Sequence, residues 1–312
     1  VFVMYPKAQV SANRIEELLN EESLIKNPEN GVKQTEVKGE VEFDNVTFVY
    51  PNGEEPVLKN ISFKCKKGEM IAFIGSTGSG KSTLINLIPR FYDVTEGSIK
   101  VDGVDVRDYD LKALRKKIGF IPQKTLLFTG SISSNIKFGK KNAKTGEVVH
   151  SAKVAQAYDF ISKKPKQFEE IISEGGKNVS GGQKQRLSIA RALVRKPEIY
   201  IFDDSFSALD FKTDSILRER LKEETKESVV LVVAQRVGSI MEADRIVVLN
   251  EGEIVGIGKH KELLKKCKSY KGKNKKLETA CAYYNIENIN AHRADSDTLA
   301  TAKLFLKIKD EY

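Results

Sequence analysis

Cysteine, histidine and tryptophan are scarce in this chain of 312 residues, which holds three cysteines, three histidines and no tryptophan. The cysteines are odd in number, far apart and without CxxC spacing, which argues against a disulfide framework or a zinc site and favours a reducing compartment. The histidines are scattered, which argues against a histidine-based metal site. These residues are Cys65, Cys267, Cys281, His150, His260 and His292.

Long apolar runs are also missing. No stretch reaches the roughly 18 consecutive apolar residues that a membrane-spanning helix needs, and the apolar start Val1–Pro6 lacks the positive region of a secretory signal. Hydrophobic residues still make up 40% of the chain and charged residues 30%. That composition supports a folded core and excludes a disordered chain. The length favours about two domains of roughly 150 residues.

The charge is unbalanced toward the positive side, with 52 Lys and Arg against 43 Asp and Glu and a net charge of +9. A basic surplus fits a nucleic-acid binder, a protein at an anionic membrane or a phosphate-binding enzyme. Composition alone does not decide between these classes. Part of the surplus lies in residues 265–276, which hold seven lysines and read as a solvated linker.

Hydrophobic spacing indicates an α/β fold. Alternating residues on either side of a Pro51-Asn52-Gly53 turn predict two antiparallel strands, and a continuous apolar run before a glycine-rich loop and a helix predicts an α/β unit. The predicted helices are 11–20 and the one after the loop, and residues 147–168 read as a helical insertion. The predicted strands are 41–50, 58–63, 70–74, 198–203, 228–233, 246–250 and 254–258. The polar stretch 27–38 reads as a linker.

A phosphate-binding loop is the most specific motif, because residues 75–83 fit the pattern GxxxxGK[ST] in full. Glycines let successive backbone N–H groups surround a phosphate, and the next helix directs its positive end at the same anion. Lys81 would contact the β- and γ-phosphates and Ser82 would ligate Mg²⁺. The loop consists of Gly75, Ser76, Thr77, Gly78, Ser79, Gly80, Lys81, Ser82 and Thr83.

Two further motifs support this loop. Four apolar residues lead into Asp203 at the carboxyl end of a predicted strand, where ligands bind in such sheets, so Asp203 would hold Mg²⁺ through water. Ser180 is a good helix N-cap before Gly181-Gly182-Gln183, leaving a helix N-terminus free for an anion. An ordinary capped helix explains the second motif equally well.

Together these residues resemble the nucleotide-binding domain of ATP-binding-cassette (ABC) transporters. The resemblance implies a P-loop NTPase core with a mixed central sheet, an antiparallel β subdomain and a helical subdomain, and it implies ATP and Mg²⁺ as cofactors. Tyr50 would stack on adenine, Val57 would line the nucleotide, and Gln123 would sense the γ-phosphate and ligate Mg²⁺. In this family two domains meet head to tail, so the signature Ser180, Gly181, Gly182 and Gln183 would bind the partner's ATP, beside the D-loop residue Asp210.

Within the family, the sequence motifs resemble those of the exporter branch. Residues 127–136 and the Glu174-Gly-Gly before the signature are similar to that branch, and residues 5–22 look like the linker after its last transmembrane helix. The resemblance implies a linker over 1–38 after a membrane domain missing from this chain, and a nucleotide-binding domain over 39–270 with its helical subdomain at about 124–195. Such a chain works at the cytoplasmic face of the plasma membrane.

Two departures from the family pattern concern the hydrolytic site, whose catalytic residues would be Lys81, Asp204 and Gln235. Asp204 stands where the family has Glu, and it is one methylene too short for a base that must reach its water within about 2.6–3.2 Å. Gln235 stands where the family has His, and a neutral amide cannot supply proton chemistry. The pair resembles the degenerate subunit of heterodimeric exporters, with a catalytically intact partner. The alternative is that both substitutions are tolerated and the site hydrolyses ATP with full activity.

The last residues, 271–312, resemble the final two helices of a DnaQ-like 3′–5′ exonuclease, with His292 and Asp297 at that family's spacing. The chain contains no Asp-x-Glu to complete such a site, so we expect neither nuclease activity nor a nucleic-acid partner. A charged tail with an exposed histidine, and a fused or misassembled reading frame, are the other interpretations.

Two other functions stay open beside the exporter. One is a soluble ABC-type ATPase that is not coupled to transport. Ribosome factors of this kind normally carry two cassettes in one chain, whereas this chain has one phosphate loop. The other is a nucleic-acid-processing module fused to the ATPase. Neither the transported substrate nor the partner subunit can be identified from these residues.

Overall fold

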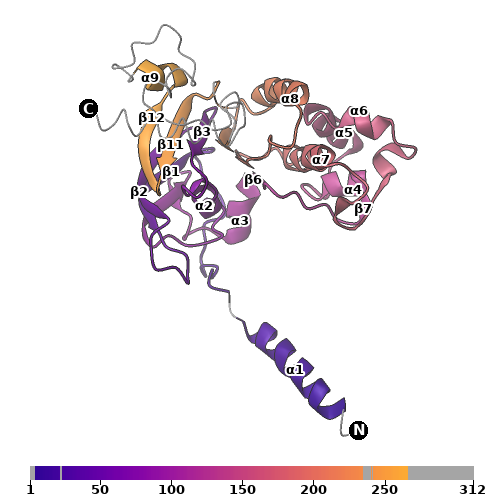
Figure 1. Cartoon of the computed structure of the whole chain (residues 1–312), viewed down its shortest axis with the longest axis horizontal. Helices are drawn as coiled ribbons and strands as arrows, with labels where there is room; N and C mark the ends of the chain where they lie inside the picture. The colour runs from indigo at the N-terminus through magenta and orange to yellow at the C-terminus, as the bar shows by residue number, and fades with distance from the viewer. Residues whose placement is uncertain (1–3, 22, 235–239, 241, 266–312) are drawn as a thin grey trace, which may run out of the picture.

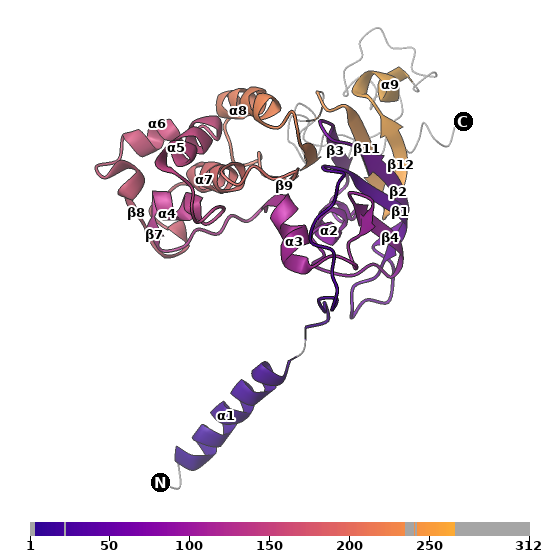
Figure 2. The same ribbon diagram turned by 180° about the vertical axis from the view of Figure 1, so that it is seen from behind.

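The structure, a computed structural model, describes residues 4–21, 23–234, 240 and 242–265. Figure 1 shows two sheets on one side of the molecule, a group of helices beside them and one helix that projects away. Figure 2 shows the same arrangement from behind. The exonuclease-like residues expected at 271–312, His292 and Asp297 among them, lie outside the described residues.

The central sheet has six strands in the order β12-β11-β3-β10-β9-β6. Five of them are parallel neighbours, and β12 pairs antiparallel with β11, so the sheet is mixed as expected. Strands β9 and β10 are buried at every residue, which explains their unbroken apolar sequences. The bounds are β3 Met70–Gly75, β6 Ile118–Ile121, β9 Ile199–Asp203, β10 Val229–Val233, β11 Arg245–Asn250 and β12 Glu253–Gly258.

A second, antiparallel sheet has the order β2-β1-β4-β5 and includes the strand pair predicted around the Pro51-Asn52-Gly53 turn. Its inner face and one face of the central sheet enclose α2 (Lys81–Leu87), since Leu84, Ile85 and Leu87 share one core with Phe43 and Phe73. The helix that carries the phosphate loop is therefore fixed between two sheets. The strands are β1 Val41–Phe48, β2 Leu58–Cys65, β4 Glu96–Val101 and β5 Val104–Asp105.

The other face of the central sheet shares a core with the group of helices, which Figures 1 and 2 place to one side of the sheets. The helical insertion expected at 147–168 is helical in the structure, but it is divided among α5 (Thr145–Val154), α6 (Tyr158–Ser162) and η1 (Gln167–Glu169). Gln156 takes a left-handed backbone conformation with φ 57°, which ends the helix and starts a separate one. The elements are β7 Gly130–Ser131, α4 Ile132–Lys137, α5 Thr145–Val154, α6 Tyr158–Ser162, η1 Gln167–Glu169, β8 Ile171–Ile172, η2 Glu174–Gly176, α7 Gly181–Leu193 and α8 Phe211–Glu224.

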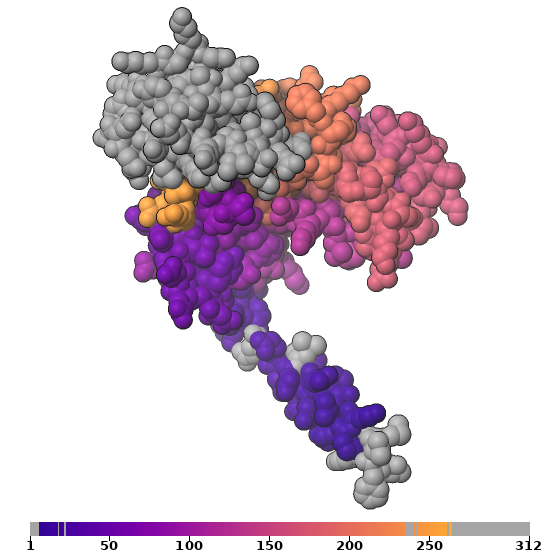
Figure 3. Space-filling view, viewed as in Figure 1, coloured from indigo at the N-terminus to yellow at the C-terminus, as the bar shows by residue number. Residues whose placement is uncertain are grey.

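Helix α1 (Met4–Asn20) projects from the rest of the molecule in Figure 1, and the space-filling view in Figure 3 shows the same projection. Its apolar side chains Val10, Ile15 and Leu19 are 51%, 59% and 77% exposed. Among the described residues, no helix combines the length and apolar character needed to cross a membrane. The final described helix is α9 (His260–Lys265), next to β12.

The polar stretch 27–38 is fastened to the segment before α3 more firmly than its composition suggests. Val32 forms a parallel bridge with Tyr109, donating to Asp108 O at 2.9 Å and accepting from Asp110 N at 3.0 Å. Asn27 accepts from the backbone N–H of Leu111 at 2.8 Å, at the start of α3 (Leu111–Lys117). This strap, residues 27–32, therefore rests on the N-terminus of α3.

A buried ion cluster fixes the other end of α3. The Lys117 ammonium donates to Asp102 at 2.8 Å, to Glu198 at 2.7 Å and to the Thr35 hydroxyl at 2.9 Å. The Asp102 side chain is 0% exposed and that of Lys117 10%, so the buried Asp102 carboxylate depends on the Lys117 ammonium for charge compensation. The cluster joins α3, the turn after β4, the start of β9 and the chain after the strap.

We predict that Lys117→Met lowers the free energy of unfolding by about 3 kcal/mol, because it leaves the Asp102 carboxylate buried without its cation. Urea unfolding of the chain measures the loss. Lys116→Met is the matched control, since Lys116 is an exposed neighbour on the same helix and its loss should cost under about 0.5 kcal/mol. Equal losses in the two variants would contradict the role assigned to the cluster.

Candidate functional site

The phosphate loop joins the end of β3 to the start of α2, as predicted. Thr83 is buried, while the loop residues Ser76, Thr77 and Gly78 reach toward solvent. Gly78 and Gly80 both have left-handed backbone angles, with φ 83° and 92°, which only glycine adopts at little cost. A Cβ at Gly80 would lie 2.7 Å from the Leu58 side chain and 3.0 Å from Val57 O, so the loop is packed closely against β2.

The Lys81 side chain curls over its own loop. Its ammonium donates to Gly75 O at 2.9 Å, to Ser76 O at 2.7 Å and to the Ser79 hydroxyl at 3.2 Å. Burial lowers the pKa of Lys81, and the nearby carboxylates of Asp204 and Asp203 oppose that shift. An ammonium satisfied only by neutral oxygens can exchange them for phosphate oxygens, which fits the predicted role.

Two of the three predicted metal ligands, Ser82 and Asp203, are in direct contact. The Ser82 hydroxyl donates to Asp203 Oδ1 at 2.9 Å, from the first turn of α2 to the carboxyl end of β9. Burial raises the pKa of Asp203, against the lowering effects of the Ser82 hydrogen bond and the Lys81 charge. A hydroxyl and a carboxylate side by side at a partly buried sheet edge are oxygen donors of the kind Mg²⁺ prefers. These residues fit the ion.

Gln123 and Asp204 also lie in contact. Gln123 follows β6, and its amide Nε2 donates to Asp204 Oδ2 at 3.1 Å. Asp204 is buried and has a left-handed φ of 45°, which marks a sharp turn directly after β9. The structure therefore places the predicted sensor and the predicted base position next to each other.

Ser205 is a residue that sequence reasoning missed. It is fully buried, and its hydroxyl donates to Ile121 O at 2.9 Å and Asp203 O at 3.2 Å. This bond ties the end of β9 to the end of β6, two residues before Gln123. A hydroxyl directly after two carboxylates was the available signal, but serine is too common in turns to identify such a tie from the sequence.

Tyr50 reaches the phosphate loop from the end of β1. Its hydroxyl and that of Thr83 lie 2.9 Å apart and share a hydrogen bond. Val57 donates its backbone N–H to Phe48 O at 2.8 Å, and its carbonyl oxygen lies next to Gly80 of the loop. Both residues predicted to contact the nucleotide therefore border the loop.

The signature residues lie elsewhere. Ser180 and Gln183 form a reciprocal capping box at the start of α7, with Gln183 N donating to Ser180 Oγ at 3.3 Å and Ser180 N to Gln183 Oε1 at 3.0 Å. Gly182 packs near Ala208 O, and Asp210 caps α8 through Thr213 N at 3.0 Å. Figures 1 and 2 place α7 in the helical group, apart from α2. Ser180 and Gly181 are exposed and do not complete the loop's own site.

The predicted switch residue Gln235 lies outside the described residues. The roles of all these side chains toward ATP and Mg²⁺ stay predictions. Within the described part, the structure brings Tyr50, the phosphate loop, Gln123, Asp203 and Asp204 to one edge of the sheets and leaves the signature and Asp210 on separate helix ends.

We predict that Gly80→Ala lowers the free energy of unfolding by about 3 kcal/mol, because backbone strain adds to overpacking against Leu58 and Val57. Gly78→Ala is the matched control, since its Cβ would meet nothing within 4 Å and it suffers only the strain of about 1 kcal/mol. Chemical unfolding without nucleotide compares the two variants. Equal losses would mean that Leu58 moves aside freely.

Comparison with known proteins agrees with this geometry. Residues 58–207 match the ABC transporter family model. Among curated proteins, the chain is 42% identical over 271 residues to the uncharacterized ABC transporter ATP-binding protein YfiB of Bacillus subtilis, a match that covers 87% of this chain and 47% of that protein. It is 45% identical over 255 residues to a putative multidrug export ATP-binding/permease protein of Staphylococcus aureus (strain NCTC 8325), covering 81% and 44%.

A solved structure of a bacterial Atm1-family ABC exporter with ATP bound is also similar, with a TM-score of 0.79, 32% identity and coverage of 85% of this chain and 47% of that chain. The chain thus spans about half the length of the relatives it matches. The loop, the mixed and antiparallel sheets and these matches agree with one another: this chain carries an ABC transporter nucleotide-binding domain, an ABC ATPase domain similar to those of exporters.

Proposed function

We propose that this chain powers a membrane exporter by binding Mg-ATP and dimerising head to tail with a second nucleotide-binding domain, and that its own hydrolytic site is degenerate. The single observation that carries ATP binding is the contact of Ser82 with Asp203 at 2.9 Å beside the Lys81 ammonium. Lys81 would hold the β- and γ-phosphates, and Ser82, Asp203 and Gln123 would hold Mg²⁺. The ion would neutralise phosphate charge.

Head-to-tail pairing is supported by the separation of the two halves of an ATP site within one chain. The phosphate loop starts α2, whereas the exposed Ser180 and Gly181 start α7. A helix N-terminus with free N–H groups attracts an anion, so the signature of one domain would close the phosphate loop of the other. Asp210, which caps α8 close by, would lie at the same interface.

A degenerate site is supported by the short carboxylate at position 204. Asp204 lacks one methylene of the Glu that the family uses, and its Oδ2 accepts a hydrogen bond from the Gln123 amide at 3.1 Å. A base held in that way would orient an attacking water poorly, because proton abstraction needs direct reach. The signature would serve the intact site of a heterodimer partner.

Attachment to a membrane domain is supported by an exposed aromatic pair beside the Gln123 segment. Phe128 and Phe138 are 42% and 61% exposed, and the Arg191 guanidinium lies over both rings at 5.4 and 5.6 Å. Leu126 is 59% exposed in the same loop. A patch of this kind, rigid at its base and apolar at its surface, suits a protein partner. This partner would place the domain at the cytoplasmic face of the plasma membrane.

The domain limits follow as part of the proposal. Residues 1–38 would be the linker that leaves the membrane domain, 39–270 the nucleotide-binding domain and 271–312 a separate helical fragment. The relatives named as ATP-binding/permease proteins support an exporter over a soluble ATPase. No described feature favours a nucleic-acid function.

We predict that the chain binds Mg-ATP but hydrolyses it slowly, and that Asp204→Glu combined with Gln235→His raises turnover at least tenfold, since a positioned base contributes about 10²–10⁴-fold. Phosphate release under saturating Mg-ATP measures the gain. Lys81→Ala is the control that loses nucleotide binding.

Asp204→Asn separates the remaining possibilities. If Asp204 does not act as a base, this variant keeps the slow wild-type rate. Hydrolysis by the wild-type chain at rates ordinary for intact members of the family, lost in Asp204→Asn, would mean that Asp204 serves as a competent base and that the site is not degenerate.

A further inference from the structure

Three aromatic rings meet at the end of β1 beside the phosphate loop. The Tyr50 and Tyr92 ring centroids lie 5.2 Å apart with an interplanar angle of 87°, and those of Phe48 and Tyr50 lie 4.9 Å apart at 78°. Phe48 and Tyr92 complete the triangle at 5.6 Å. Tyr50 is thus supported on two sides by rings nearly perpendicular to its own.

This arrangement suits a ring that stacks on a flat ligand. Perpendicular, edge-to-face contacts are a preferred geometry for aromatic pairs and fix the ring plane. Among the described residues, no ring lies parallel to Tyr50. A purine base would supply that missing parallel neighbour. The orientation of the Tyr50 plane therefore depends on the rings around it.

Both ends of α2 hold Tyr50. At the first turn of α2, Thr83 shares the 2.9 Å hydrogen bond with the Tyr50 hydroxyl. After the last turn, the chain returns through Arg90–Asp93 and places Tyr92 against the same ring. One short helix therefore connects the phosphate loop with both supports of Tyr50.

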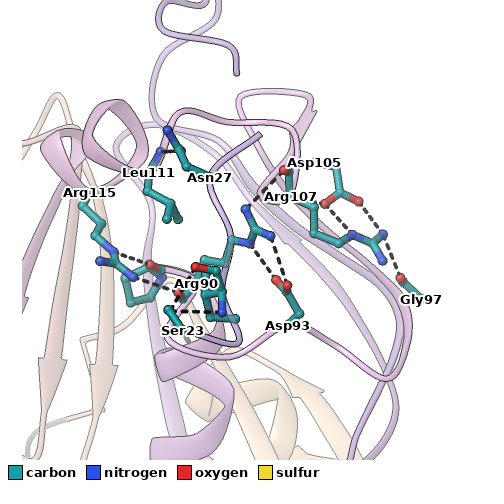
Figure 4. A network of polar contacts seen from close by, with 11 residues as sticks. Ser23, Asn27, Arg90, Asp93, Gly97, Asp105, Arg107, Leu111 and Arg115 are labelled. Carbon is teal, nitrogen blue, oxygen red and sulfur yellow. Dashed lines mark hydrogen bonds and ion pairs between the residues drawn. The ribbon is translucent and has the colours of Figure 1, made fainter. Parts of the chain in front are cut away.

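The turn that carries Tyr92 is fixed by a polar network, drawn in Figure 4. Arg90 is buried with a left-handed φ of 53°, and its guanidinium donates to both Asp93 oxygens at 2.6 and 3.0 Å. Its third contact is Arg107 O at 3.2 Å. Arg115 donates to Pro89 O and Arg90 O, each at 3.0 Å, from α3. Tyr92 is thereby held on a rigid backbone.

We propose that Tyr92 is a positioning residue for nucleotide recognition, which holds the Tyr50 ring in the plane that stacks on the purine base. The inference rests on the base-stacking role of Tyr50 in the proposed function. It divides the binding of ATP into two parts: the affinity due to the base depends on Tyr92, and the affinity due to the phosphates does not.

The test compares binding of ATP and of inorganic tripolyphosphate, both with Mg²⁺, by calorimetry on the full chain. Tyr50→Ala should weaken ATP binding about tenfold, within the range of base–aromatic stacking. Tyr92→Leu should weaken it about threefold, the size of one aromatic pair contact, and Tyr92→Phe, which keeps the ring, should match wild type. Tripolyphosphate affinity should stay unchanged in the two Tyr92 variants.

The outcomes separate the inference from the proposed function. If Tyr50→Ala leaves ATP affinity unchanged, the stacking role of Tyr50 is wrong and the inference falls with it. If Tyr50→Ala weakens ATP binding and Tyr92→Leu does not, the inference alone is wrong. If Tyr92→Leu weakens the binding of tripolyphosphate as much as that of ATP, the substitution damages the phosphate loop in general, and the inference is also wrong. Should Tyr92→Leu not fold, Tyr92→Met fills the space with a flexible side chain and takes its place.

Discussion

The candidate site depends on the strand register that brings Ser82 and Asp203, two residues far apart in sequence, into hydrogen-bond contact. This contact is possible only because α2 starts and β9 ends at the same sheet edge. Parallel pairing of β9 with β10, and of β10 with β3, brings Asp203 level with Val233 and Val233 level with Phe73. Once that register is set, the phosphate loop, the metal ligands and Gln123 on β6's extension have little freedom to lie elsewhere.

The burial of α2 also fixes the position of the phosphate loop relative to the sheet edge. Leu84, Ile85 and Leu87 are fully buried between the two sheets, so the helix cannot rotate without opening a core. Ser205 adds a tie between β9 and β6 where the chain leaves the sheet toward the helical group. Packing therefore fixes the sheet edge that carries the phosphate loop and Asp203. The positions of the polar residues there follow from this packing.

Much of this arrangement was predictable from the sequence. The glycine-rich loop, the apolar run into Asp203 and the alternating strands 41–50 and 58–63 each carry a local signal, and the antiparallel pairing of those two strands was predicted from it. The break at Gln156 was not predictable, because a left-handed glutamine has no sequence signature and its neighbours favour helix. The ties of Ser205 and of the strap to α3 were not predictable either, since they depend on contacts between segments distant in sequence.

The bridge between Val32 and Tyr109 has a mechanical consequence. A pull on α1 along the chain would not reach the domain first at β1, where the strand begins, but at the N-terminus of α3. Gly31 makes that junction tight, because a Cβ there would lie 2.5 Å from Asp110 N. Helix α3 in turn is anchored by Lys117 to the base of β9. A load on the strap would therefore pass through α3 to the strand that ends at Asp203.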